Sequence, residues 1–395
     1  MKLTVRVLAK HLAKTDEEML FMLKEVGILV ENSDSPLTNV QIYSLKRYIK
    51  EIKFKERREK RIYVYVKGKK YELKEKIGDG GEGQVYKIEN KKVCKIYNKV
   101  DKLKEEKLRL MIDRNLEYEG ICFPKDIVYN FEGEVIGYIM NEAKGVEMQK
   151  SLMGKKQIEE YFPSLKKRDM VELGVTILKK VEYLHKQKII LGDINPRNIL
   201  ICSPREVYFV DTDSYQIESF PCCVGSTVYT APEIQRRDFN NFLRSYGNEN
   251  FAIATLLFMI MVPGKPPYSK KNGEDIVKNI LNMDFSYPMK DGENENIPEG
   301  LWQYCWSHLP LYIKRAFYKT FKKGEDYNKE KERIDASKWR TYMEKYLKFI
   351  DEGKIEKNDE MSLEIFPTRY KKQKEEIDYE EEGKYRLIFR KLLNI

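Results

Sequence analysis

The sequence predicts an α+β protein with two lobes, preceded by a small helical module and followed by a charged tail. Three observations carry this prediction: apolar residues recur at helical spacing in the first 60 residues, alternate with period two from residue 62, and return to helical spacing after residue 165. A strand-rich segment followed by a helix-rich segment is typical of the α+β class. The 395 residues, 42% of them hydrophobic, are enough for two or three domains with large cores.

Two capping boxes open two amphipathic helices within residues 1–60. Each pairs a threonine, Thr15 or Thr38, with a Glu or Gln three residues later. Gly27 provides the end of the first helix. The second helix carries nine basic and three acidic residues over residues 46–61. This basic run is interpreted as a solvated face with Glu/Lys pairs, or alternatively as a nucleic-acid patch.

The module resembles a known domain. VRVLAKHLAKTDEEMLFMLKEVGILVE followed by SPLTNVQIYSLKRYI is similar in spacing and apolar pattern to the small N-terminal domain of bacterial translation initiation factor two. The resemblance implies that residues 1–60 contact the ribosome, RNA or a translation factor. The formal net charge of +10 is compatible with nucleotide or nucleic-acid partners but does not require them.

Short strands and tight turns are predicted from residue 62 to residue 97. The glycine run Gly78, Gly80 and Gly83 lies between two of these strands and fits the pattern GxGxxGxV. Strands on both sides argue against the strand-to-helix dinucleotide fingerprint. A glycine hairpin can bring backbone N–H groups close to phosphates because no Cβ intervenes. Lys95, on the next strand, would hold the α- and β-phosphates.

The strongest constellation is LGDINPRNIL, residues 191–200, followed by FVDTD, residues 209–213. Phosphoryl transfer needs a carboxylate that orients the attacking hydroxyl and hard oxygen ligands that hold Mg²⁺. Asp193 and Asn198 lie five residues apart on one loop, and Asp211 follows an intervening strand. These residues supply both requirements.

Residues 62–348 resemble the protein kinase family through the glycine loop, Val93-Cys94-Lys95, the Asp193–Asn198 loop, Asp211 and the TAPE sequence at residues 230–233. The resemblance implies a kinase fold that uses ATP and Mg²⁺. It implies catalytic roles for Asp193, Lys95, Arg197 and Glu105, with Glu105 on the following helix pairing with Lys95. It implies metal ligands Asn198 and Asp211, a structural pair Glu233 and Arg333, and a structural Glu249. The implied ATP site consists of Gly78, Gly80, Gly83, Val85, Val93, Lys95, Met140, Asn141, Ala143 and Leu200.

Several positions depart from the family pattern. Gly192 replaces the arginine before the catalytic aspartate, so control by activation-loop phosphorylation is not expected. Asn195 stands where a lysine is usual, and Arg197 is expected to neutralise γ-phosphate charge instead. Thr212 replaces the aromatic of the metal-binding triplet. Asp213 replaces its glycine and is interpreted as a capped turn in preference to an additional carboxylate near the metals. The set GDxNPxN, DTDS and TAPE resembles a divergent bacterial kinase subgroup.

The expected domains are a helical module (1–60), an N-lobe (61–142), a C-lobe (143–348) and a charged, partly helical tail (349–395). Six scattered cysteines without a repeated CxxC spacing disfavour a zinc site or a disulfide framework. The N-terminus lacks the apolar core of a signal peptide, and the longest apolar run is twelve residues. We therefore expect a reduced, cytoplasmic protein that does not bind membranes.

Three functions compete. The first is an active Ser/Thr-type protein kinase that phosphorylates a protein hydroxyl. The second is a small-molecule phosphotransferase of the aminoglycoside or choline kinase type, which shares the GDxxxxN loop but lacks the Glu233 and Arg333 pair. The third is a pseudokinase scaffold, suggested by the missing arginine and aromatic. The presence of Lys95, Asp193 and the metal ligands favours the first.

Overall fold

The computed structural model describes residues 3–12, 14–59, 62–271, 275–289, 296–299 and 302–354. The chain divides into two compact units, Met1–Glu75 and Lys76–Ile395. In the part of the chain described, every helix is too short or too polar to span a membrane. Of the predicted tail (349–395), residues 349–354 are described, and residues 355–395 lie outside the described residues.

The first unit contains α1 (Val5–His11), α2 (Asp16–Glu25) and α3 (Asn39–Glu59), followed by the antiparallel hairpin of β1 (Tyr63–Val66) and β2 (Lys69–Glu72). The predicted box at Thr15 is present, because Thr15 Oγ1 accepts the Glu18 N–H and the Glu18 carboxylate accepts the Thr15 N–H. Leu8, Met19, Leu23 and Leu45 are among the residues of its small apolar core.

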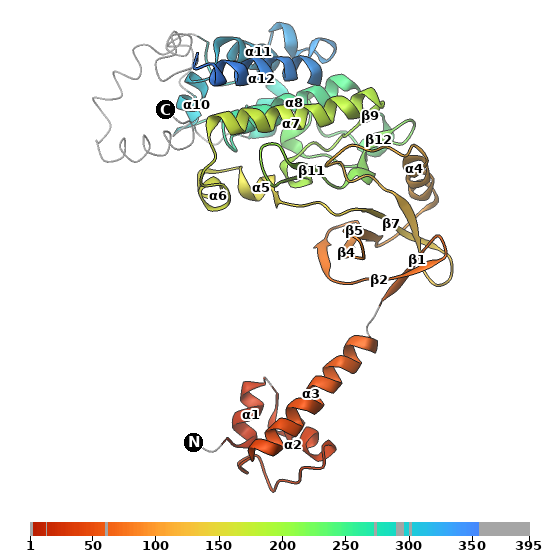
Figure 1. Ribbon diagram of the computed structural model, residues 1–395. Helices are drawn as coiled ribbons and strands as arrows, with labels where there is room; N and C mark the ends of the chain where they lie inside the picture. The colour runs from red at the N-terminus through yellow and green to blue at the C-terminus, as the bar shows by residue number, and fades with distance from the viewer. Residues whose placement is uncertain are drawn as a thin grey trace, which may run out of the picture. The chain divides into compact units, whose positions relative to one another are not determined.

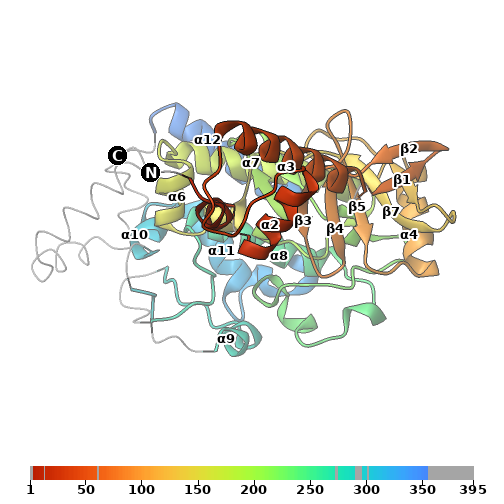
Figure 2. The same cartoon turned by 90° about the horizontal axis from the view of Figure 1, so that it is seen from below.

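The second unit begins with a strand-rich lobe (Figures 1 and 2). Five of its strands follow the order β6-β7-β5-β4-β3 in one antiparallel sheet. In this register Lys95 lies opposite both Val85 and Tyr138, and Val93 lies opposite Met140. The strands and the helix of this lobe are β3 (Lys76–Asp79), β4 (Gly83–Lys87), β5 (Lys92–Tyr97), α4 (Lys102–Asp113), β6 (Asp126–Tyr129) and β7 (Val135–Asn141).

The helix-rich lobe follows. Its short strands are β8 (Val146–Glu147), β9 (Ile189–Ile190), β10 (Ile199–Ile201), β11 (Val207–Phe209) and β12 (Gln216–Ile217), and they pair as β11-β10-β8 and β12-β9. Its helices are α5 (Met148–Ser151), α6 (Lys155–Tyr161), α7 (Lys167–Lys186), α8 (Tyr246–Met261), α9 (Ile276–Asn282), α10 (Trp302–Ser307), α11 (Leu311–Phe321) and α12 (Ala336–Asp351).

The core of this lobe is centred on α8, most of whose residues are buried. Helix α7 packs against both α8 and α12, and the three helices lie together in the helix-rich lobe (Figure 1). Phe258 of α8 contacts the rings of Phe285, Trp306 and Phe321, among others. A rigid base of this kind holds the loops that follow β9 and β11. The predicted α+β class, with a strand-rich lobe preceding a helix-rich one, is confirmed.

Candidate active site

The loop between β9 and β10 presents the carboxylate of Asp193. Asp193 Oδ2 accepts from Asn195 Nδ2 at 2.6 Å and from Asn198 Nδ2 at 3.3 Å, and Oδ1 accepts from Ser226 Oγ at 3.0 Å. Asn195 also caps the 3₁₀ turn Pro196–Asn198 by accepting the Arg197 N–H. The loop therefore holds one carboxylate oxygen by two amides and turns the other toward a serine hydroxyl.

Glu249 of α8 binds the backbone at the start of the loop that carries Asp193. Its fully buried carboxylate accepts the N–H of Leu191 at 3.0 Å and of Gly192 at 2.7 Å, one on each oxygen. His185 Nε2 lies 2.8 Å from Glu249 Oε1. Hydrogen bonds to an ionised acceptor are shorter and stronger than neutral ones. Glu249 therefore fixes the backbone that precedes Asp193, which agrees with the structural role implied for it.

The triplet Asp211-Thr212-Asp213 follows β11, and its backbone conformation and side-chain hydrogen bonds fix its position. Asp211 adopts the left-handed backbone region (φ 57°), which aspartate tolerates better than most residues. Thr212 is fully buried and donates its hydroxyl to the Cys122 carbonyl at 2.8 Å. Asp213 is also buried, and both its oxygens accept hydrogen bonds from the N-lobe. The hydroxyl of Thr212 thus anchors the position where the family carries an aromatic.

Lys95 contacts the two aspartates of this triplet. Its ammonium lies 2.5 Å from Asp211 Oδ1 and 2.9 Å from each oxygen of Asp213. Although burial opposes the charged form, the negative charges of both aspartates raise the pKa of Lys95. Burial would raise the pKa of Asp213, but the charge of Lys95 and the hydrogen bonds of two tyrosines lower it. Partial burial, followed by the charge of Asp213, raises the pKa of Asp211.

The pairing of Lys95 with Glu105 does not occur in this structure. Glu105 lies on α4 and accepts two hydrogen bonds from Arg109, at 2.9 and 2.6 Å. Arg109 follows Glu105 by four residues, so the two side chains meet on one exposed face of the helix. The Lys95 ammonium instead donates its hydrogen bonds to Asp211 and Asp213. The sequence prediction for Glu105 is corrected accordingly.

The glycine loop forms a tight turn between β3 and β4. Gly80 and Gly83 exchange backbone hydrogen bonds, with N–H to carbonyl distances of 3.0 and 3.3 Å. A Cβ on Gly83 would lie 2.2 Å from the Ile96 carbonyl oxygen, so only glycine fits there. A Cβ on Gly78 would meet Val85 at 3.4 Å, which is an ordinary contact. Of the three predicted glycine positions, Gly83 is the one at which the close approach of β4 and β5 requires glycine.

Apolar residues predicted for the ATP site gather in the same lobe. Val93 and Met140 are buried in one cluster, against which Val85 and Ala143 pack. Asn141 ends β7 and is exposed, and Leu200 lies half-buried on β10. The structure thus brings four of these six residues into contact with one apolar cluster.

The proposed metal ligands lie on adjoining segments. The Asn198 carbonyl accepts the N–H of Val210 at 3.0 Å, which ties Asn198 to the residue before Asp211. The Asp211 side chain is 41% exposed. Asn198 uses its amide nitrogen toward Asp193, so its amide oxygen is available. Carboxylate and amide oxygens are the hard ligands that Mg²⁺ prefers, and these residues therefore fit a magnesium ion.

Arg244 holds the segment that follows β12. Its buried guanidinium donates to the carbonyls of Cys222 at 3.2 Å and Val224 at 2.6 Å. It also stacks on the ring of Phe239, 4.0 Å from the ring centroid. A Cβ on Gly192 would lie 2.4 Å from this guanidinium. An arginine from a distant loop therefore occupies space that Gly192 leaves open beside the Asp193–Asn198 loop.

Glu233 and Arg333 form a bidentate ion pair. The two guanidinium nitrogens donate to the two carboxylate oxygens at 2.6 and 2.8 Å, and Asn248 donates to Glu233 at 2.8 Å. Although partial burial opposes ionisation, the hydrogen bonds and charge of Arg333 lower the pKa of Glu233. The structure brings together the two residues that the resemblance implied as a pair.

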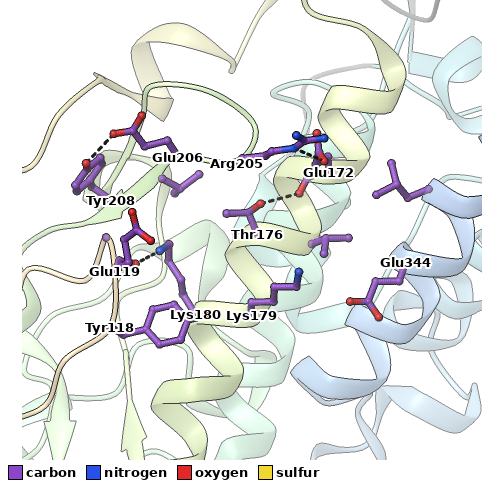
Figure 3. Close-up of a pocket in the computed structure, with 14 residues that line it drawn as sticks. Tyr118, Glu119, Glu172, Thr176, Lys179, Lys180, Arg205, Glu206, Tyr208 and Glu344 are labelled. Atoms are coloured by element: carbon purple, nitrogen blue, oxygen red, sulfur yellow. Dashed lines mark hydrogen bonds and ion pairs between the residues drawn. The ribbon is translucent and has the colours of Figure 1, made fainter. Parts of the chain in front are cut away.

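A cavity of about 630 Å³ is lined by residues of α7, α12 and β11 and by residues 118–120 (Figure 3). Buried Lys180 donates to the Glu119 carbonyl beneath it. A Cβ on Gly120 would lie 2.1 Å from the Val207 carbonyl oxygen, so this turn lies directly against β11. The contacts fix the chain just before Cys122, whose carbonyl accepts from Thr212.

Sequence reasoning missed the roles of Asp213, Tyr97, Tyr138 and Arg244. Period two along residues 93–97 places Tyr97 on the face of Lys95 and was a usable signal. No local pattern marked Arg244, since its partners are distant in sequence.

A protein kinase domain model matches residues 71–301, more than half of the chain. The chain therefore belongs to the protein kinase family, and the predicted kinase-like fold is confirmed. Protein kinase YegI of Escherichia coli (strain K12) is 26% identical over 266 residues, which cover 63% of this chain and 41% of the relative. Calcium-dependent protein kinase 5 of Plasmodium berghei is 24% identical over 322 residues, covering 77% and 50%. Serine/threonine-protein kinase ppk21 of Schizosaccharomyces pombe is 25% identical over 233 residues, covering 54% and 40%. The chain thus spans half or less of the length of these relatives.

Proposed function

We propose that this protein is an active ATP- and Mg²⁺-dependent protein kinase that phosphorylates serine or threonine hydroxyls of a protein. The observation that supports it most is the hydrogen bond from Ser226 Oγ to Asp193 Oδ1, at 3.0 Å. A serine hydroxyl can reach this carboxylate while two amides hold the other oxygen. The name of the relative ppk21 of Schizosaccharomyces pombe, a serine/threonine-protein kinase, agrees with this specificity.

In this mechanism Asp193 Oδ1 orients the substrate hydroxyl and accepts its proton as the oxygen attacks. Asn195 and Asn198 keep the carboxylate in place, and Glu249 keeps the loop in place. When bound, MgATP supplies the phosphoryl group and the cationic charge that favours its transfer. Asp211 and Asn198 would hold the metal. The N–H groups of the glycine loop other than those of Gly80 and Gly83, which bond each other's carbonyls, would face the phosphates.

Two cations of the site would face the phosphates. Lys95 donates to the α- and β-phosphates in this scheme. Arg197 is exposed, and its guanidinium has no hydrogen-bond partner among the described residues. A guanidinium matches the geometry of a phosphate well, which supports the assignment of Arg197 to the γ-phosphate.

The test is transfer of labelled phosphate to proteins of a whole-cell extract by the wild-type protein and by Asp193→Asn. Asn retains the shape of the side chain but not its basicity, so we expect transfer to fall by about 10²–10⁴-fold with unchanged MgATP affinity. Asp113→Asn, an exposed change on α4, is the matched control and should label like wild type. Equal labelling by wild type and Asp193→Asn would overturn the assignment of the catalytic residue.

The pseudokinase alternative is favoured by the departures at Gly192 and Thr212. It predicts MgATP binding without any labelled protein that depends on Asp193. A small-molecule phosphotransferase would likewise label no protein, but would consume ATP when its substrate is added. The pair of Glu233 and Arg333 and the match to the protein kinase family support the protein kinase over the small-molecule enzyme. The presence of Lys95, Asp193 and the two metal-ligand candidates supports it over the pseudokinase.

We also propose that residues 1–60 bring the kinase to the translation machinery through RNA. The basic run of residues 46–61 supports this proposal, since phosphate contacts dominate affinity for nucleic acid. The expected result is co-sedimentation with ribosomes that weakens as salt rises and is lost when residues 1–60 are deleted. Sedimentation that does not depend on salt would contradict this proposal and favour the interpretation of the basic run as a solvated helix face.

A further inference from the structure

We propose that Asp213, rather than an acidic residue of α4, is the positioning residue that orients Lys95 in the nucleotide site. The inference rests on the proposed function, in which Lys95 binds the phosphates of ATP. It assigns a role to a carboxylate at the position where the family carries a glycine.

The contacts of Asp213 account for all of its side chain. Each carboxylate oxygen lies 2.9 Å from the Lys95 ammonium. Oδ2 also accepts from the Tyr97 hydroxyl at 2.7 Å, and Oδ1 from the Tyr138 hydroxyl at 2.6 Å. A buried carboxylate is stable only when it is paired and hydrogen-bonded, and this one is both.

The sheet explains why these donors converge. Tyr97 follows Lys95 by two residues on β5, so both side chains point to the same face. Tyr138 on β7 lies directly opposite Lys95 in the antiparallel register, and its side chain shares that face. Three donors from two adjacent strands thus surround one acceptor, Asp213, contributed by the other lobe.

Asp211 and Asp213 differ in exposure, which suits them to different roles. Both bond Lys95, but the Asp211 side chain is 41% exposed and that of Asp213 is 5% exposed. The Lys95 side chain is 7% exposed. An ammonium has three N–H donors, so Lys95 can keep Asp213 and exchange Asp211 for a phosphate oxygen. The exposed aspartate is then available for metal, and the buried one keeps the lysine in place.

This arrangement separates Lys95 from α4. Glu105 is engaged by Arg109 on the surface of that helix. The position of Asp213 is set by its own segment, because the adjacent Thr212 is anchored on the Cys122 carbonyl. The orientation of Lys95 therefore depends on the segment that follows β11, and a displacement of α4 alone would not release it.

The experiment compares wild type, Asp213→Asn and Glu105→Gln. Calorimetry gives the MgATP dissociation constant of each protein, and unfolding in the absence of nucleotide gives its unfolding equilibrium constant. We expect Asp213→Asn to raise the MgATP dissociation constant by about tenfold or more, a factor equivalent to about 1.4 kcal/mol. Asp113→Asn serves as the control for an Asp-to-Asn change at an exposed site. A double-mutant cycle of Lys95→Met with Asp213→Asn should show coupling of about tenfold in the unfolding equilibrium constant, and the same cycle with Glu105→Gln none.

A purely structural role would lower stability and leave the MgATP dissociation constant of the folded protein unchanged, and that result overturns the inference. Loss of affinity in Glu105→Gln with none in Asp213→Asn would also overturn it. If Asp213→Asn does not fold, Tyr138→Phe decides, since it removes one donor and should weaken MgATP binding about threefold. If Lys95 and Asp213 are coupled and Asp213→Asn loses MgATP affinity, but the wild-type protein labels no protein of the extract, the proposed function is refuted and this inference stands.

Discussion

Replacing Glu249 with Gln should destabilise the C-lobe and disturb the catalytic loop together. The carboxylate accepts one backbone N–H on each oxygen, from Leu191 and Gly192, and is fully buried. Gln offers one acceptor oxygen, so its NH₂ group must face the second N–H. That N–H loses its partner in a place that water does not reach.

The magnitude follows from these contacts. A buried N–H left without a partner costs about 1–3 kcal/mol, and the remaining hydrogen bonds lose the reinforcement of the negative charge, about 1 kcal/mol more. We therefore expect a loss of about 3 kcal/mol in the free energy of unfolding. Asp193 donates its N–H to the Leu191 carbonyl at 2.9 Å, so the displacement reaches the Asp193 carboxylate, to which we assign the proton transfer. A misplacement of this kind should lower phosphoryl transfer on the order of 10²-fold.

Tryptophan fluorescence during urea unfolding is a suitable assay, because the three tryptophans, Trp302, Trp306 and Trp339, all lie in the C-lobe. The signal therefore reports the lobe that contains Glu249. Glu160→Gln, an exposed change on α6, is the matched control and should unfold like wild type. If Glu249→Gln unfolds within about 0.5 kcal/mol of that control, the support attributed to the carboxylate is refuted.

Two further predictions concern the segment after β12 and the thiols. Arg244→Ala removes both guanidinium bonds to this segment, so limited proteolysis within residues 218–226 should accelerate several-fold, whereas exposed Arg236→Ala should leave the rate unchanged. Burial raises the pKa of Cys94 to about 12. Because only the thiolate reacts, iodoacetamide at pH 8 should modify exposed Cys223 and spare Cys94 until the protein unfolds, as mass spectrometry of the peptides would show.

Local signals in the sequence predicted much of the fold. The capping box at Thr15, the periodicity of α7 and the alternation in β5 depend on residues within a few positions of one another, and all three elements are present. The Asp193–Asn198 loop was recognisable for the same reason. These features are encoded by spacing, which a single sequence displays directly.

The partner of Lys95 could not be predicted in this way. Residues 95 and 213 are separated by 118 positions, and their contact depends on how the two lobes pack. Helical spacing selected Glu105 from the acids of α4, but that spacing served equally well for the pair with Arg109. A capped turn at Asp213 was the natural interpretation of its neighbours alone, because nothing local reveals three donors on a distant sheet.

The departures from the family pattern are compensated by contacts from elsewhere in the fold. Where Gly192 replaces an arginine, Arg244 enters the space and binds the neighbouring segment. Where Thr212 replaces an aromatic, its hydroxyl anchors the triplet on a backbone carbonyl. Where Asp213 replaces a glycine, it binds the lysine that α4 leaves free. Each replacement is thus matched by a specific partner, so the fold accommodates all three departures without leaving the new side chains unpaired.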